Sequence, residues 1–319
     1  MTTYRQVKGY SVKSVAGDPA NVKEGQIWYN SSAKEIKVVP FIESWSSGGN
    51  MGTGRRALWG AGSQTAGLAF GGYIGPAISN ATEEYGGTSW TSGGNLSGGR
   101  YHLAGTGTQT AGLAFGGLAV TGQPKSSATE EYNGSSWSGG GNMGTARYVL
   151  SGLGIQTAAV AFGGAPSPTA TEEYDGSSWT SGGNYPESKS AQGGCGTLTA
   201  GLGVGGSPDT SLTCEYNGTS WTAVNDANYD VNNGWASGSQ TVAVLSGGSP
   251  EANRPKTQTY DGTTWSTSSA TLSQGTYAPG GSSVSGTASL SFGGGYPGGN
   301  SVVTEEFTSQ TAARSVDVS

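Results

Sequence analysis

Basic and acidic residues recur at fixed positions in this chain, and they are its first candidates for chemistry. A basic residue precedes four successive Gly-Gly pairs by the same spacing: Arg55, Arg100, Arg147 and Lys189. Adjacent glutamates recur in three of these units: Glu83/Glu84, Glu130/Glu131 and Glu172/Glu173. A ring of cations would suit an anion or an acidic glycan, whereas pairing with the carboxylates would make the same residues structural.

The fifth and sixth units help to choose between these alternatives. The fifth unit has Val231 and no Glu-Glu, so the cation and the carboxylates are lost together. The sixth has Glu305-Glu306 but Tyr277 at the basic position, which weakens the correlation. The sequence therefore favours structural ion pairs and leaves the anion site as an alternative.

Side chains for catalysis or metal binding are scarce. Glu83 and Glu84 are neighbours on an expected strand and point to opposite faces, so they are not the carboxylate pair of a glycosidase. His102 is the only histidine, and we expect it on a surface strand. Cys195 and Cys214 are expected to be free thiols in a β core, without zinc. The sequence predicts no enzyme, no cofactor and no metal.

A repeat of 42 to 47 residues positions these side chains. It is marked by six tryptophans: Trp45, Trp90, Trp137, Trp179, Trp221 and Trp265. The first whole unit predicts four strands, at 57–62, 65–70, 82–85 and 89–92, and Asn-Gly or Asp-Gly turns join the last two strands in later units. Four antiparallel strands per unit indicate a propeller blade.

The ends of the repeat predict how the ring closes. The sixth unit has strands near Ser282, Leu290 and Glu305 but lacks a fourth, which residues 41–47 around Trp45 can supply. The expected fold is therefore all-β: a six-bladed propeller of four-stranded antiparallel blades over residues 41–319, closed by an N-terminal strand. Residues 1–40 lie outside the repeat and predict a short β-hairpin, with strands on both sides of Asn30-Ser31-Ser32.

Composition limits the partners. The chain has 319 residues and a net charge of −6, which gives no electrostatic footprint for nucleic acid. No apolar run is long enough to insert into a membrane, and Met1 to Val15 lack the apolar core of a signal peptide.

Two segments carry a resemblance to known families. An apolar strand ending in Gly-Gly, then a Tyr, then a Trp resembles the kelch repeat from residue 45 to about 307, with a shorter Tyr-to-Trp gap than is usual. The segment from Glu24 to Ser31 (EGQIWYNS) resembles a short element of bacteriophage tail-fibre and virion structural proteins. Together they resemble kelch-like virion proteins of tailed, especially marine, phages.

This resemblance implies a non-enzymatic virion protein, assembled in the host cytoplasm and present in many copies. Residues 1–40 would dock to other virion proteins, and the ring would present loops to a host-surface glycan or protein. The alternatives are a kelch-like adaptor for a protein partner and, less favoured, a sialidase-like glycosidase. The sialidase-type turn is one residue short at Asp175–Trp179, and one histidine cannot supply the ligands of a kelch-like copper oxidase.

The loops that follow each Gly-Gly pair vary in length, and variable loops on one face of a rigid ring are the expected place for binding. Neutral insertions are the alternative. The candidate binding residues in these loops are Tyr73, Ile74, Lys125, Arg254, Lys256 and Tyr296, in addition to the basic ring of Arg55, Arg100, Arg147 and Lys189.

Overall fold

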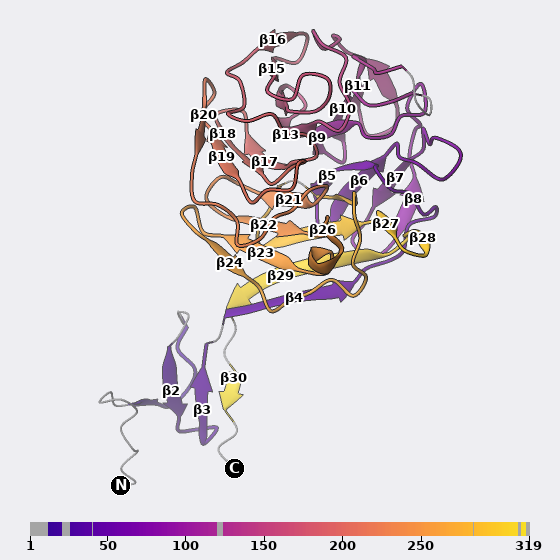
Figure 1. The fold of residues 1–319 in the computed structure, drawn as a ribbon. Helices are drawn as coiled ribbons and strands as arrows, with labels where there is room; N and C mark the ends of the chain where they lie inside the picture. The colour runs from indigo at the N-terminus through magenta and orange to yellow at the C-terminus, as the bar shows by residue number, and fades with distance from the viewer. Residues whose placement is uncertain are drawn as a thin grey trace. The chain divides into compact units, whose positions relative to one another are not determined.

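The repeated segments each become one strand of a four-stranded antiparallel sheet (Figure 1). The computed structural model describes residues 12–20, 26–39, 41–119, 124–282, 284–311 and 314–316. Contacts divide the chain into two compact units, residues 45–307 and residues 1–44 with 308–319. No helix in the described ranges combines the length and apolarity needed to span a membrane.

Six of these sheets follow one another along the chain. The first three are β5 (Trp59–Ser63), β6 (Ala66–Phe70), β7 (Thr82–Tyr85) and β8 (Trp90–Ser92); β9 (Ala104–Thr108), β10 (Ala111–Phe115), β11 (Thr129–Tyr132) and β12 (Trp137–Gly139); and β13 (Ser151–Ile155), β14 (Ala158–Phe162), β15 (Thr171–Tyr174) and β16 (Trp179–Ser181). The next two are β17 (Gly193–Thr197), β18 (Ala200–Val204), β19 (Thr213–Tyr216) and β20 (Trp221–Ala223); and β21 (Trp235–Gly238), β22 (Ala243–Ser246), β23 (Thr257–Tyr260) and β24 (Trp265–Thr267).

The sixth sheet combines both ends of the repeat. Its strands are β25 (Gly280–Gly281), β26 (Ala288–Phe292), β29 (Thr304–Thr311) and β4 (Phe41–Ser47), in that order. The segment around Trp45 therefore supplies the fourth strand, as the sequence predicts. A short 3-10 helix, η1 (Glu251–Asn253), and a small hairpin of β27 (Gly295–Tyr296) and β28 (Gly299–Asn300) lie in loops of the fifth and sixth units.

The first strands of successive sheets are neighbours, and β25 contacts both β21 and β5. This crowding requires glycine. A Cβ atom on Gly60 of β5 would lie 2.2 Å from the carbonyl oxygen of Gly281, too close for any side chain. Larger groups such as Leu68 and Phe70 are fully buried in the clusters between sheets. Repeated, closely packed antiparallel sheets of this kind are the architecture of a β-propeller.

The repeated tryptophans and threonines join neighbouring sheets. Each indole N–H donates to a threonine hydroxyl of the adjacent sheet at 2.8 to 3.0 Å. The pairs are Trp90–Thr304, Trp137–Thr82, Trp179–Thr129, Trp221–Thr171, Trp265–Thr213 and Trp45–Thr257. The Trp and Thr of the repeat are thus contacts between units.

The second unit is a sheet made from both chain ends. In it β1 (Lys13–Val15) pairs in parallel with β2 (Ile27–Asn30), β2 pairs antiparallel with β3 (Glu35–Val38), and β3 pairs antiparallel with β30 (Arg314–Val316). The predicted β2–β3 hairpin is confirmed. Residues 1–11, 21–25 and 40 lie outside the described residues, and so do Glu24 and Gly25 of the phage-like segment.

Candidate functional site

Three arginines of the repeated basic position are buried in equivalent ion-pair clamps. Arg55 Nη2 donates to Glu83 Oε1 at 2.7 Å, and its Nη1 donates to the carbonyl oxygens of Gly71 and Ala81 at 2.9 and 2.8 Å. The other carboxylate oxygen of Glu83 accepts the Gly52 N–H at 2.7 Å. Arg100–Glu130 and Arg147–Glu172 repeat the ion pair at 2.6 and 3.0 Å.

Burial leaves these arginines inaccessible. Arg55 and Arg147 are 0% exposed and Arg100 is 4% exposed. Desolvation lowers the pKa of each guanidinium, and the neighbouring carboxylate opposes that shift. The geometry supports the structural ion pairs that the sequence favours, because the guanidinium groups face their own carboxylates and backbone instead of solvent.

The fourth basic residue has a different environment. Lys189 Nζ lies 3.4 Å from Glu187 Oε2 and donates to the Pro208 carbonyl at 3.4 Å. Cys214 occupies the strand position that Glu83 holds in the first sheet. Lys189 is 8% exposed, so it also lies mostly below the surface.

In the sixth unit, the residue at the basic position is one residue earlier than the sequence spacing indicates. The Thr276 carbonyl accepts the Gly248 N–H, as the Arg100 carbonyl accepts the Gly72 N–H. Thr276, and not Tyr277, therefore stands at the basic position. Tyr277 instead aligns with Arg56, since both pair with the segment after a Gly-Gly. The sequence could not show this offset, because the sixth unit has few residues in common with the others.

The second glutamate of each pair, and Glu215 after Cys214, accepts a hydrogen bond from the tyrosine of an adjacent sheet. The bonds are Tyr85–Glu306, Tyr132–Glu84, Tyr174–Glu131, Tyr216–Glu173 and Tyr260–Glu215. Burial, and then the hydrogen bond to Glu84, raises the pKa of Tyr132 to about 12. The repeated carboxylates are therefore occupied in contacts within and between sheets.

The variable loops and the starts of the first strands share one face. Tyr73, which follows the first Gly-Gly, exchanges two backbone hydrogen bonds with Arg56 at 2.8 and 3.2 Å. The same bridge recurs in the other units: Tyr101 with Leu118, Tyr148 with Ala165, Ser190 with Ser207, Asn232 with Ser249, and Tyr277 with Gly295. We call this surface the loop face.

The predicted loop residues are spread around the loop face. Ile74 is 37% exposed beside Tyr73, and Lys125 is exposed in a loop whose residues 120–123 lie outside the described residues. The Arg254 guanidinium lies 5.0 Å from the Tyr277 ring centroid, and Lys256 Nζ lies 4.9 Å from that of Tyr229. Tyr296 is partly buried in β27. Ligand binding by these residues stays a prediction.

A cyclic set of backbone hydrogen bonds surrounds the meeting point of the sheets. Each N–H donates to the carbonyl oxygen of the previous member at 2.8 to 3.0 Å, and the first member donates to the last. All six residues have φ between 49° and 59°, although none is glycine. The members of this axial ring are Ala57, His102, Val149, Ala191, Asn233 and Ala278.

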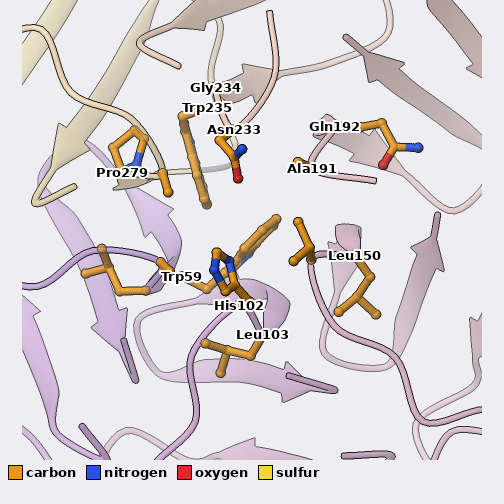
Figure 2. Close-up of a pocket in the computed structure, with 14 residues that line it drawn as sticks. Trp59, His102, Leu103, Leu150, Ala191, Gln192, Asn233, Gly234, Trp235 and Pro279 are labelled. Carbon is orange, nitrogen blue, oxygen red and sulfur yellow. The ribbon is translucent and has the colours of Figure 1, made fainter. Parts of the chain in front are cut away.

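The axial ring lines a cavity of about 40 Å³ (Figure 2). Trp235 and Asn233 lie on one side of it, and Trp59 and His102 lie on the other. The Trp59 and Trp235 ring centroids are 4.9 Å apart. A cavity of this size holds at most about three water molecules, so it is too small for a sugar or a cofactor.

The expectation that His102 lies on a surface strand is wrong. It belongs to the axial ring, with φ of 51°. Burial, and then the charge of Arg56, lowers the pKa of His102 to about 4, so the imidazole is neutral at pH 7. Histidine is among the residues that tolerate this backbone conformation, but the repeat spacing carries no signal for it.

Within the described ranges, no group of three or more His, Cys, Asp or Glu residues is arranged to hold a metal ion. Cys195 and Cys214 are both buried free thiols. Burial raises the pKa of Cys195 to about 12 and that of Cys214 to about 11, which keeps both protonated and unreactive.

Comparisons with known proteins bear on the fold. A solved structure titled "Structure of YjhT" is similar to this chain, with a TM-score of 0.67 and 14% sequence identity. The alignment covers 83% of this chain and 99% of that one. No protein-family model matches the sequence, and no curated protein matches it significantly. At this identity the likeness bears on the fold alone and supports a β-propeller.

Proposed function

We propose that this chain is a non-enzymatic adhesion protein of a bacteriophage particle. Its loop face would contact a glycan on the host surface, and residues 1–40 would dock it to other virion proteins. Several copies on one particle would add weak contacts into avidity without a tight single site. The protein would be assembled into the virion in the host cytoplasm.

One observation carries the binding role. The repeated arginines and glutamates are occupied in contacts within and between sheets, whereas other aromatic and basic side chains lie on the loop face. A rigid scaffold with variable loops on one face is a common design for recognition. The phage assignment is supported by the resemblance of the EGQIWYNS segment and the kelch-like repeat to virion proteins.

We further infer that the six sheets are the blades of one closed ring. The contact of β25 with both β21 and β5, the pairing of β4 in the sixth sheet and the cyclic axial ring support this inference. A closed ring leaves no unpaired sheet edge between the first and last units and holds the loops rigidly.

A glycan array probed with the purified full chain tests the binding role. We expect retention on a subset of host-type glycans and no cleavage of those glycans by mass spectrometry. Binding to none of them, or cleavage of a bound glycan, would overturn the proposal. Electron microscopy of a particle that carries the protein tests docking, since residues 1–40 must then be in contact with the particle.

A further inference from the structure

We propose that Arg56, Tyr73 and Tyr101 form a subsite for an acidic sugar, a hexuronic acid residue, on the loop face. The inference rests on the proposed function and names the chemical class of glycan that this part of the face would take.

The three side chains come from different segments and lie side by side, with the two tyrosine rings tilted at 46° to each other. The Arg56 guanidinium carbon lies 4.7 Å from the Tyr73 ring centroid, and the Tyr73 and Tyr101 centroids are 5.6 Å apart. Arg56 precedes β5, Tyr73 follows β6, and Tyr101 precedes β9. All three are only partly buried, and Ile74 is exposed beside them. Aromatic rings placed in this way offer apolar faces to the C–H groups of a sugar ring.

Asn300 of β28 holds the row in place. Its Oδ1 accepts a hydrogen bond from Arg56 Nη1 at 2.9 Å, and its Nδ2 donates to the Tyr73 carbonyl at 3.0 Å. One amide thus fixes both the guanidinium and the loop that carries Tyr73. Residues fixed before binding lose less entropy when the ligand arrives.

The charge of Arg56 gives the subsite its preference. A guanidinium has five N–H donors, and in the described part of the chain the hydrogen bond of this group is the one to Asn300. Arg55 directly before it has a buried carboxylate partner, whereas no ion pair to Arg56 occurs among the described residues. A carboxylate on the ligand fits the remaining donors of Arg56, because arginine binds planar carboxylates in a bidentate manner.

The axial cavity limits how the sugar lies. His102 adjoins Tyr101, with ring centroids 5.1 Å apart, and it also lines the cavity. The cavity is too small for a sugar ring, so in this proposal the sugar lies across the tyrosines with its carboxylate toward Arg56. His102 is neutral at pH 7, so Arg56 supplies the charge at this end of the row.

Matched probes test the assignment with the full chain. The probes are tetrasaccharides of galacturonate, glucuronate and mannuronate, each compared with its methyl ester by isothermal titration calorimetry. We expect at least one acid form to bind at least tenfold more tightly than its ester. Arg56→Gln should remove that preference and leave ester binding unchanged, while Tyr73→Ala and Tyr101→Ala should each weaken both forms about tenfold.

Tyr148→Ala and Tyr277→Ala are the controls, because Tyr148 and Tyr277 occupy, in other units, the position that Arg56 holds in the first. They should change affinity less than twofold, and circular dichroism melting must show that every variant folds. Equal affinity for acid and ester, or loss of binding in the controls but not in Arg56→Gln, overturns the subsite while adhesion stands. An array that retains no glycan at all overturns the proposed function instead.

Discussion

Sheets one to three and sheets four to six use the same strand positions but fill the buried polar ones differently. The first three hold an arginine against a glutamate. The fifth has Val231 and Gln258 at these two positions, both buried, and the fourth has Lys189 and Cys214. In the fifth sheet cation and carboxylate are replaced together, because a buried charge without its partner costs several kcal/mol. In the fourth the cation stays and Lys189 pairs with Glu187 instead.

The contacts between sheets show the same pairing. Five junctions have a tyrosine that donates to a glutamate, whereas the sixth has Phe307 without a hydroxyl and Thr259 without a carboxylate. The sixth sheet is the exception for the clamp, since Glu305 remains buried opposite Thr276. A cavity of about 10 Å³ lies between these two residues, enough for about one water molecule.

The largest expected effect comes from replacing the buried arginine of the third sheet with the valine of the fifth, while the glutamate of the third sheet stays. Arg147→Val leaves Glu172 buried without its cation and should lower the free energy of unfolding by about 3–5 kcal/mol. Urea unfolding followed by tryptophan fluorescence measures it. A loss below about 1 kcal/mol would show that the clamp contributes little.

Completing the exchange should recover part of that loss. Arg147→Val with Glu172→Gln reproduces Val231 and Gln258, and the Gln258 side chain still accepts a backbone N–H from Asn228 at 2.6 Å. We expect the double variant to be about 2 kcal/mol more stable than Arg147→Val alone. If the second change adds a further loss, the paired replacement is not the reason for the difference between sheets.

Exchanging one member of the axial ring should change how the free energy of unfolding depends on pH. His102 has a folded-state pKa of about 4, below its ordinary value of 6.5, so only the unfolded chain gains this proton as the pH falls between these values. The free energy of unfolding should therefore fall by about 2 kcal/mol more between pH 6.5 and pH 4 in the wild-type chain than in His102→Asn. This variant gives the second unit the residue that Asn233 provides in the fifth. Parallel pH profiles of unfolding free energy would refute this.

The smallest expected effect concerns the contact between sheets. Tyr132→Phe removes the hydroxyl that bonds to Glu84 and should cost about 1 kcal/mol. Adding Glu84→Thr, to match Phe307 and Thr259, should then cost less than the same change made in the wild-type chain. A double-mutant cycle measures the coupling, and strict additivity would contradict it.

Much of the fold could be predicted from sequence because the repeat fixes spacing. The turns and the Trp and Tyr positions placed strands such as β6 and β8 within one or two residues of their observed bounds. The pairing of β30 with β3 gave no signal, since three residues have no periodicity to detect.

The site was less predictable. Tyr73 and Ile74 stood out in a variable loop, but Arg56, Tyr101 and Asn300 did not. The contact of Arg56 with Asn300 joins residues 244 positions apart, so it exists only once the first and last units meet. The position shared by Arg56, Tyr101, Tyr148 and Tyr277 was the missed signal, since it follows the basic position directly in each unit.

The axial ring has one more consequence, for how such a chain can be altered. Because each member donates to the one before it and none is first, the ring does not depend on where the polypeptide starts. We expect a circular permutant opened in the loop between β18 and β19 to keep all six bonds. Removing a whole repeat would remove one member of the ring, so the N–H and the carbonyl on either side of it would lose their partners. The cycle of hydrogen bonds thus tolerates a change in the position of the termini but not a change in the number of repeats.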